Sequence, residues 1–412
     1  MDKYKDFKVA DDGILKVRQY GKSFIFQIGL QYNEISYFLG SVVERFDAYK
    51  NSYRPIDHLK HFDEIALVTA VYGTNTIEGA TLSKEETRAI LKNSKQINVS
   101  KDNKTRVLNL GNAYEHAYKL GALSSPHYIH EFNSLTGFDL KLPYISEQNI
   151  KELHKIAMQD LSNEVDSPGC YRNERNEPLT IVGDKRHGHF YIPPKAKDVE
   201  YLMTAFCAWL NSDPILKLHP LYRAPLAHFY FELIHPFKDG NGRVGRLIEA
   251  FLLYGSGYGK LASALSGFYE KNISQYFSQL NQCGKLADKD PYPNTGFVKF
   301  FLERFKETVV FFEKDRNDDN KYCDYMHAVR FLYGKKKLNS RQKCIMEELI
   351  NAECFDKAIN LQQQPWYLEL YRKLSDKTKQ RDIKDLIKLS LLQNNKETGE
   401  ISLDKLAGSS DT

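Results

Sequence analysis

One stretch of thirteen residues, from Ile234 to Arg246, collects the residue types in this chain that are best suited to chemistry. In one-letter code it is IHPFKDGNGRVGR, with one histidine, one aspartate, three glycines, one asparagine and two arginines. Histidine titrates near neutral pH and can take a proton from a reacting hydroxyl. Glycines and arginines beside it favour an anionic substrate, so the stretch is the first candidate for a functional site.

The order of residues in this stretch predicts a helix, a loop and a second helix. His235 precedes Pro236, and a residue before proline is driven out of the right-handed α region. We therefore expect the first helix to end at Ile234 and the second to begin at about Arg243. Gly240 and Gly242 can adopt positive φ and expose backbone N–H groups, which together with a helix N-terminus form an anion site.

The charged side chains of the stretch predict a polyphosphate and a metal ion. Arg243 and Arg246 are one turn apart, so both can contact the same anion. Asp239 would repel phosphates unless a divalent cation bridged them, and Mg²⁺ is usually bound by few carboxylates together with phosphates. No Lys-Ser/Thr pair follows the glycines, so the loop is not a Walker loop.

Simpler interpretations exist for each part of the stretch. A Gly-Asn-Gly tripeptide is usually only a turn, and a lone histidine near a helix end is more often structural than catalytic. Glu232 and His235, with His228 one turn earlier, match half of a di-iron carboxylate motif. The sequence holds no second Glu-x-x-His, and Pro236 takes His235 off the helix, so the metal alternative is disfavoured.

The complete pattern H-P-F-x-D-G-N-G-R-x-x-R resembles the signature of the Fic family of nucleotidyl transferases. The preceding HPLYRAPLAHFYFELIHPF is similar to the helix before that signature, and SPGCYRNERNEPLTIVG with the later YIPP is similar to the flap hairpin of the family. The similarity covers roughly residues 60–310. It implies an enzyme that transfers AMP from ATP to a Tyr, Thr or Ser hydroxyl of a target protein and releases pyrophosphate.

The resemblance also implies a role for each residue of the signature. His235 would be the general base, and Asp239 would hold Mg²⁺ on the α- and β-phosphates of ATP. Arg243 and Arg246 would neutralise the phosphates, with Arg246 nearest the γ-phosphate. The anion hole would be formed by Gly240, Asn241 and Gly242.

Two further positions refine the expected specificity. The phosphotransferase branch of the family carries a lysine at the position of Gly242, so the glycine here favours adenylyl transfer. Tyr276 falls where the family often places an aromatic side chain near the adenine. On its own pattern, Tyr276 is equally consistent with a core residue.

The segment TNTIEG, from Thr74 to Gly79, predicts a built-in inhibitor. It closes a helix expected at about residues 61–79, and a glutamate in a last helical turn gains most from a cationic partner. The segment resembles the inhibitory helix of the family, [Ser/Thr]-x-x-x-Glu-[Gly/Asn]. The resemblance implies that Glu78 pairs with Arg246 in the space of the γ-phosphate and that Thr74 steadies the pair. An exposed glutamate is the simpler alternative, and removal of AMP, which some such family members perform, stays open.

Two β-prone runs, Leu179–Val182 and Phe190–Ile192, predict a hairpin. Its edge would pair with an extended segment of the target protein through main-chain hydrogen bonds. Ile181 and Val182 are candidates for an apolar clamp on that segment. A hairpin that only covers the core is the equally weighted alternative.

Composition limits the class of protein. The length of 412 residues predicts two or three domains, and a net charge of +5 argues against a protein that coats nucleic acid while permitting a local basic patch. The six cysteines form no Cys-x-x-Cys pair, which disfavours a disulfide framework or a zinc module. The first residues lack the apolar core of a signal peptide, and no apolar run would span a bilayer. We expect a cytoplasmic protein without a membrane partner, and a homodimer is one expected assembly.

The predicted fold is mostly α-helical: a Fic-type helical core with a small β-hairpin flap and a C-terminal winged helix-turn-helix. Helix starts are indicated by a capping box at Ser83-x-x-Glu86 and by Ser146 before a helix from Asn149. The expected domains are an N-terminal helical region, the Fic core, a linker and the winged helix, at residues 1–105, 106–312, 313–329 and 330–412.

The C-terminal region has its own candidate function. Its second helix carries polar side chains that would meet phosphates or base edges of DNA, namely Lys377, Lys379, Gln380 and Arg381. Winged helices also bind proteins, so a protein partner stays open. The competing interpretation of the whole chain is a DNA-binding regulator that uses the Fic core as a nucleotide sensor without turnover.

Overall fold

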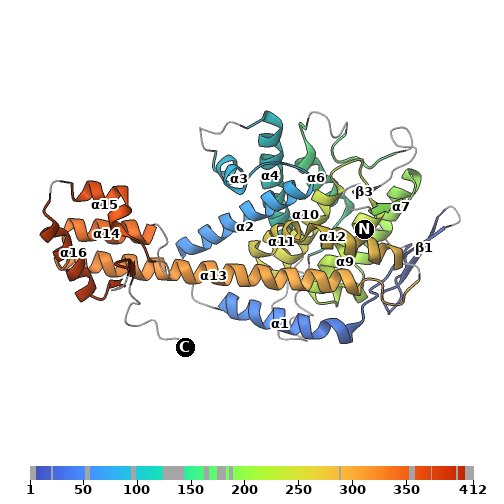
Figure 1. The fold of residues 1–412 in the computed structure, drawn as a ribbon. Coiled ribbons are helices and arrows are strands. Elements are labelled where there is room, and N and C mark those ends of the chain that lie inside the picture. The colour runs from blue at the N-terminus through green and yellow to red at the C-terminus, as the bar shows by residue number, and fades with distance from the viewer. Residues whose placement is uncertain are drawn as a thin grey trace. The chain divides into compact units, whose positions relative to one another are not determined.

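The computed structural model divides the chain into two compact units, Met1–Val310 and Phe311–Thr412, which we describe separately. The residues that the structure describes are 6–19, 22–51, 56–93, 99–123, 143–161, 167–173, 182–184, 189–286, 289–351, 358–372, 374–395 and 398–403. Helices dominate both units, as the sequence predicts (Figure 1). No described helix is both long and apolar enough to cross a membrane.

The first unit is a helical assembly around two central helices, α9 and α10 (Figure 1). Its helices are α1 (Tyr32–Asn51), α2 (Ile56–Ile77), α3 (Lys84–Leu91), α4 (Lys101–Leu123), α6 (Glu147–Met158), α7 (Ala196–Leu210), α8 (Asp213–Leu216), α9 (Pro220–Ile234), α10 (Asn241–Leu253), α11 (Leu265–Lys271) and α12 (Ile273–Leu286). Two short turns of other helical types follow α10, η2 (Tyr254–Tyr258) and η3 (Lys260–Ala264). Helix α13 (Thr295–Gly334) starts in this unit and ends in the second.

Helix α9 lies in the core because its residues are apolar on nearly every side. All of them except Glu232 are buried, as expected for a helix without a polar face. Pro220 occupies the first helical position, where its missing N–H costs nothing. His219 caps the helix, since its Nδ1 accepts a hydrogen bond from the N–H of Leu221 at 3.2 Å. The other end of α9, at Ile234, lies at the candidate site.

Helix α2 packs against α11 at very short range, and Gly73 is the reason. A Cβ atom at Gly73 would lie 2.5 Å from the backbone of Ser266 and Gly267, closer than real Cβ atoms come. In isolation a helical glycine costs about 1 kcal/mol relative to alanine. Here the missing side chain lets α2 approach the core, so its last turn reaches the candidate site.

The predicted helix starts at Ser83 and Ser146 are confirmed. The N–H of Glu86 donates to Ser83 Oγ at 3.1 Å, and Glu86 Oε2 accepts the N–H of Ser83 at 2.8 Å, which completes the capping box of α3. Ser146 caps α6 in the same way, with Asn149 as its partner. Helix α6 therefore begins at Glu147, two residues before the position expected from sequence.

Two antiparallel hairpins complete the described part of the first unit. Strands β1 (Leu15–Gln19) and β2 (Lys22–Phe26) form a pair that the sequence analysis does not anticipate. Strands β3 (Val182–Asp184) and β4 (His189–Tyr191) form the predicted flap hairpin, with Val182 opposite Tyr191. The first strand of that hairpin begins at the residue where the sequence analysis expects it to end.

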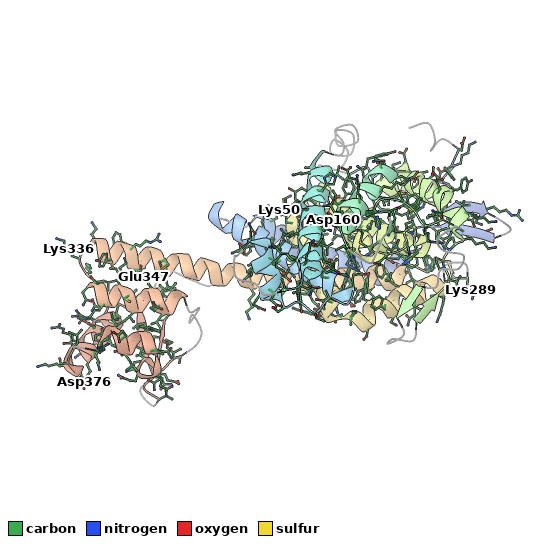
Figure 2. All side chains as sticks on the ribbon, turned by 90° about the horizontal axis from the view of Figure 1, so that it is seen from above. Lys50, Asp160, Lys289, Lys336, Glu347 and Asp376 are labelled. Atoms are coloured by element: carbon green, nitrogen blue, oxygen red, sulfur yellow. The ribbon has the colours of Figure 1, made fainter. Side chains whose placement is uncertain are left out.

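The described part of the second unit contains the end of α13, followed by α14 (Ser340–Asn351), α15 (Pro365–Leu370) and α16 (Asp376–Lys388) and a hairpin of β5 (Leu392–Asn394) and β6 (Ile401–Leu403), with a short turn η4 (Leu361–Gln363). Asp376, at the start of α16, is labelled in Figure 2. Ile359 makes an isolated antiparallel bridge with Ile401 of β6. The winged-helix assignment stays a prediction, although three helices followed by a hairpin are what that assignment requires.

A buried aspartate ties α16 to the rest of the second unit. Arg341 Nε donates to Asp382 Oδ2 at 2.7 Å, and the hydroxyl of Tyr371 donates to the same oxygen at 2.8 Å. Burial alone would raise the pKa of Asp382, but hydrogen bonds from Arg341, Tyr371 and Asn339 lower it below its ordinary value. The inner face of α16 is thus fixed by an ionised carboxylate.

The predicted domain boundaries fall inside helices. The boundary expected at residue 105 lies within α4, and both of its sides belong to the first unit. The expected linker, residues 313–329, lies within α13. The two compact units meet at residues 310 and 311 instead.

Candidate functional site

His235 lies directly after α9 and is the C-cap of that helix. Its φ and ψ are 50° and 61°, a left-handed conformation outside the α region that Pro236 disfavours. Arg172 holds this turn in place. Arg172 Nε donates to the carbonyl oxygen of His235 at 2.7 Å, its Nη2 donates to that of Ile234 at 3.2 Å, and its N–H donates to that of Pro236 at 2.9 Å.

The imidazole of His235 faces the carboxylate of Glu232 across one helical turn. His235 Nδ1 and Glu232 Oε2 are 3.5 Å apart, and both side chains are only 15% exposed. Burial raises the pKa of Glu232, but His235, His228 and Arg246 outweigh it and hold this pKa below its ordinary value. With Nδ1 toward an ionised carboxylate, Nε2 is the nitrogen that can meet a reacting group.

The loop between the two helices is held by its own asparagine. Asn241 Oδ1 accepts the N–H of Phe237 at 2.9 Å, and Asn241 Nδ2 donates to the carbonyl oxygen of Phe237 at 2.8 Å. Helix α10 therefore begins at Asn241, two residues before the predicted start. Gly240 is its N-cap with φ of 80°, and the N–H of Gly240 donates to Asp239 Oδ1 at 2.6 Å.

His154 of α6 supports this loop from below. The N–H of Gly169 donates to His154 Nδ1 at 2.8 Å, so Nε2 carries the proton and donates to the carbonyl oxygen of Asp239 at 3.0 Å. Its ring stacks on Phe237, with ring centroids 3.7 Å apart. Burial lowers the pKa of His154 to about 4, which keeps this ring neutral.

Arg246 is buried and turned toward the end of α2. Its side chain is 1% exposed, and its Nη2 donates to Glu78 Oε1 at 2.5 Å. Its Nε donates to Thr74 Oγ1 at 3.4 Å. Burial alone would lower the pKa of Arg246, but Tyr276 and Glu78 raise it above its ordinary value. The structure thus brings together Thr74, Glu78 and Arg246, the three residues of the predicted inhibitory contact.

A buried hydrogen-bond network continues beyond Arg246. Arg246 Nη1 donates to the hydroxyl of Tyr276 at 3.3 Å, and that hydroxyl is 3.0 Å from His228 Nε2. His228 Nδ1 is 2.8 Å from Glu249 Oε1. Tyr276 is only 1% exposed, so its ring lies in the core as a support for Arg246. This position does not favour a contact with adenine.

Arg243 and Arg246, the two arginines of the signature, therefore do not face the same space. Arg243 lines a pocket, whereas Arg246 is not among the described residues that line it. Arg243 Nη1 also contacts Met158 Sδ at 2.8 Å. Gly242 directly precedes Arg243, and a Cβ atom there would come too close to Glu78 Oε1.

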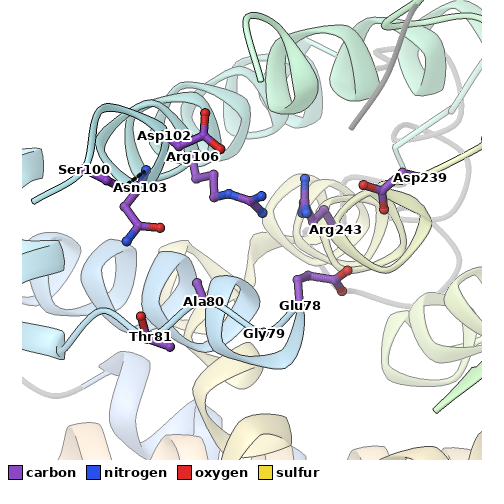
Figure 3. Close-up of a pocket in the computed structure, with 10 residues that line it drawn as sticks. All are labelled: Glu78, Gly79, Ala80, Thr81, Ser100, Asp102, Asn103, Arg106, Asp239 and Arg243. Carbon is purple, nitrogen blue, oxygen red and sulfur yellow. Dashed lines mark hydrogen bonds between the residues drawn. The ribbon is translucent and has the colours of Figure 1, made fainter. Parts of the chain in front are cut away.

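The pocket has a volume of about 370 Å³ and opens beside Glu78, as Figure 3 shows. Its described lining combines the end of α2, the start of α4 and the α9–α10 loop. The lining residues are Glu78, Gly79, Ala80, Thr81, Ser100, Asp102, Asn103, Arg106, Asp239 and Arg243. Carboxylates and arginines both face the cavity, so it suits a phosphate with an associated cation.

A metal ion at this site would need the phosphates of a bound nucleotide in addition to protein side chains. Among the described residues, no group of three or more histidine, cysteine, aspartate or glutamate side chains is placed to hold a metal. Of the carboxylates that line the pocket, Asp239 belongs to the signature together with Arg243, and one carboxylate fits Mg²⁺, which binds one or two carboxylates and otherwise phosphates.

The structure describes little of the predicted apolar clamp in the flap hairpin. Ile181 lies outside the described residues. Val182 begins β3, and only its backbone is described.

The sequence analysis misses Arg172, His154 and Arg106, because each is an isolated polar residue whose partners come from other segments.

Comparison with known proteins places these features in a family. Residues 144–253 match the model of the Fic/DOC family. "Protein adenylyltransferase Fic" of Drosophila mojavensis is 30% identical over 277 residues, which cover 66% of this chain and 46% of that protein. The protein of the same name from Culex quinquefasciatus is 30% identical over 205 residues, 48% of this chain and 34% of that protein. The matches span less than half the length of these two relatives.

Solved structures show the same fold. A Fic family protein from Desulfovibrio desulfuricans G20 superposes with a TM-score of 0.52 at 17% identity, covering 90% of this chain and 97% of that one. A Fic domain containing signaling protein from Bacteroides thetaiotaomicron gives a TM-score of 0.51 at 18% identity, covering 66% of this chain and 95% of that one. Residues 144–253, which include the His235 turn and the signature that follows it, are the part of this chain that matches the Fic/DOC family model.

Proposed function

We propose that this chain transfers AMP from ATP to a Tyr, Thr or Ser hydroxyl of a target protein and releases pyrophosphate. The observation that carries the proposal is the turn at His235. Arg172 and Glu232 fix this histidine beside a helix N-terminus and a pocket lined by Asp239 and Arg243. The names of the curated relatives, protein adenylyltransferase Fic, support the same activity.

The proposed reaction is a single displacement at the α-phosphorus. The target hydroxyl oxygen attacks this phosphorus while His235 Nε2 takes the hydroxyl proton. The bond from the α-phosphorus to the bridging oxygen breaks, and pyrophosphate leaves with that electron pair. The N–H groups at the N-terminus of α10, those of Asn241 and Gly242 and of the N-cap Gly240 once it leaves Asp239 Oδ1, bind the phosphates. Such transfers depend on positioning and charge stabilisation rather than on a covalent intermediate.

Charge neutralisation is assigned to three side chains. Arg243 contacts the phosphates from the pocket wall, and Arg246 contacts the γ-phosphate once it is free of Glu78. Asp239 would hold Mg²⁺ on the α- and β-phosphates, and that ion would supply further stabilisation of the charge on the leaving group.

We also propose that the enzyme inhibits itself through Glu78. The supporting observation is the contact of Glu78 with Arg246, steadied by Thr74. While it lasts, the carboxylate lies where the γ-phosphate would pair with Arg246, so the α-phosphorus is misaligned for attack. The target protein is unidentified, and the chain itself is a candidate through self-modification. A homodimer and a role of Glu78 in removing AMP are further parts of the hypothesis.

Label transfer from α-³²P-ATP with Mg²⁺ tests these proposals. Three forms of the full chain are compared on their own side chains and on a cell lysate: wild type, Glu78→Gly and Glu78→Gly with His235→Ala. We expect the Glu78→Gly form to incorporate more label than wild type, and the double variant to lose it by about 10²-fold or more. Equal labelling with and without His235 would refute the transfer mechanism. Equal labelling of wild type and Glu78→Gly would refute self-inhibition.

A cytoplasmic location belongs to the proposal as well. Among the cysteines whose side chains the structure describes, none forms a disulfide: Cys170, Cys207, Cys283 and Cys344. Free thiols are typical of reducing compartments.

DNA binding by the second unit is a second candidate function, and one observation favours it. Four exposed basic side chains follow one another along α16 at intervals of four, three and four residues, which places them on one face: Lys377, Arg381, Lys384 and Lys388. Lys379, also predicted, pairs with Asp376 at 2.9 Å instead. A gel shift with duplex DNA tests this candidate. Binding should weaken steeply between 50 and 200 mM salt, a range in which phosphate contacts are lost, and a shift that salt leaves unchanged would contradict it.

A further inference from the structure

One wall of the pocket beside Glu78 has no part in the function proposed above. Asp239 and Arg243 belong to the Fic signature, whereas Arg106 comes from α4. Figure 3 shows the side chains of Arg106 and Arg243 extending toward one another across the pocket. A second arginine, from a separate helix, therefore faces the space that Arg243 faces.

The charge of Arg243 acts on Arg106. The pKa of Arg106 is lowered, first by burial and then by the positive charge of Arg243. Asp102, Asp239 and Glu78 act in the opposite direction on the same guanidinium. Two guanidinium groups that repel across a cavity are best stabilised by an anion between them, and their planar geometry matches the oxygens of a phosphate.

Arg246 is engaged elsewhere in this structure. Its Nε, Nη1 and Nη2 donate to Thr74, Tyr276 and Glu78, and its side chain is 1% exposed. A triphosphate that enters while Glu78 stays in place must bring its terminal phosphate to another cation. Arg106 lines the same pocket as Glu78, so it is placed to be that cation.

We propose that Arg106, together with Arg243, binds the terminal phosphate of ATP in the state in which Glu78 holds Arg246. The proposal rests on the proposed function only for the choice of ATP as the ligand. It deepens self-inhibition, because the inhibited enzyme then has a defined second position for the terminal phosphate. A volume of about 370 Å³ lies within the range of small-molecule sites.

The carboxylates of the pocket are compatible with this phosphate site. Glu78 is paired with Arg246 at 2.5 Å. Asp239 is the expected ligand of a cation that would accompany the phosphates. Among the described lining residues, Asp102 is then the carboxylate that opposes Arg106 and Arg243. Asp102 belongs to the first turn of α4, where the positive end of the helix dipole offsets part of its charge.

Calorimetric titration of the full chain with ATP or AMP, in the presence of Mg²⁺, tests the proposal. Arg106→Ala should bind ATP about 10- to 100-fold more weakly than wild type, because a charge-assisted contact is lost, and should bind AMP unchanged. Arg106→Lys should recover part of the ATP affinity. Lys104→Ala is the matched control, since Lys104 is exposed on the same helix and is not among the described residues of the pocket. Wild-type ATP affinity in Arg106→Ala, or an equal loss for AMP, would overturn the proposal.

A second comparison tests the dependence on Glu78. In the Glu78→Gly background Arg246 is free to take the terminal phosphate, so Arg106→Ala should cost less ATP affinity than it does in wild type. An equal cost in both backgrounds would overturn the proposal. These titrations measure binding without transfer. A chain that binds ATP as expected but transfers no label would therefore contradict the proposed function and leave this inference standing.

Discussion

The α9–α10 turn and helix α16 differ in the burial of their positive charges. At the turn, Arg246 and Arg172 are almost fully buried, and each donates to several acceptors from distant segments. On α16, Lys377, Arg381 and Lys384 are exposed to solvent. The buried arginines stabilise the conformation of the turn, whereas the exposed side chains of α16 form part of the protein surface.

This difference predicts how each region responds to change. A buried charge cannot lose its partners without leaving polar groups unsatisfied, so single substitutions there have large effects. Exposed charges are screened by salt and contribute nearly independently of one another. A single substitution in the turn should therefore disrupt the whole site, whereas each substitution on the surface of α16 should have a small and separate effect.

Replacing Arg172 by methionine should produce the largest loss of stability. Methionine fills similar space but leaves the carbonyl oxygens of Ile234, His235 and Pro194 without their guanidinium donor. We expect the free energy of unfolding in urea to fall by about 3 kcal/mol or more, with label transfer lost in parallel. If Arg172→Met unfolds at the wild-type urea concentration, the turn at His235 does not depend on this clamp.

Acid should destabilise the first unit through its buried histidines. Burial lowers the pKa of His219 from 6.5 to about 4, and this ring caps α9 as a neutral acceptor. The stabilisation is complete above pH 6.5 and is lost as the pH falls toward 4, by roughly 3 kcal/mol at most.

His219→Asn tests this prediction, because asparagine caps a helix well and does not titrate. The fall in unfolding free energy between pH 6.5 and pH 4 should be smaller in the variant than in wild type. A residual fall is expected from His154, whose pKa burial also lowers to about 4. Identical pH profiles for wild type and His219→Asn would contradict the assignment.

Glu232→Gln should affect catalysis more than substrate binding. The amide keeps the shape of the side chain but removes the negative charge that faces His235 at 3.5 Å. In the Glu78→Gly background we expect kcat for label transfer to fall about 10- to 100-fold, since a misplaced catalytic group costs that order of rate. The KM for ATP should stay the same. A rise in KM at constant kcat would mean that Glu232 serves nucleotide binding instead.

The smallest effects on stability should come from the exposed face of α16. Arg381→Ala and Lys384→Ala should each change the unfolding free energy by no more than about 0.5 kcal/mol. If the second unit binds DNA, each should also lower the slope of log affinity against log salt by about 1.

Asp382→Asn, on the inner face of the same helix, is the buried counterpart. It should destabilise by about 1–3 kcal/mol, because its partners Arg341 and Tyr371 lose an ionised acceptor. Equal effects on stability from substitutions on both faces of α16 would contradict the expected difference between buried and exposed charges.

Local sequence rules predict much of this site, and non-local contacts explain the rest. Pro236 predicts the end of α9 at Ile234, and the Ser83–Glu86 pair predicts the start of α3, because both depend on neighbouring residues. Arg172 and His154 carry no local signal, since their partners lie up to 85 residues away along the chain.

The two residues whose placement differs from expectation show the same limit. Tyr276 matches a family position, but its hydroxyl is engaged by Arg246 and His228 inside the core. Strand β4 ends at Tyr191, one residue before the expected end, because β-prone runs do not fix register without their tertiary neighbours. Helix geometry alone predicts that Arg243 and Arg246 contact one anion, whereas Arg246 pairs with Glu78, as the family resemblance implies.

Gly242 is a position where one substitution would reach two parts of the site. Its backbone belongs to the first turn of α10, and a Cβ atom there would come too close to Glu78 Oε1 unless that side chain moved. If Glu78 restrains the enzyme as proposed, replacing this glycine would alter the anion-binding turn and loosen the restraint together.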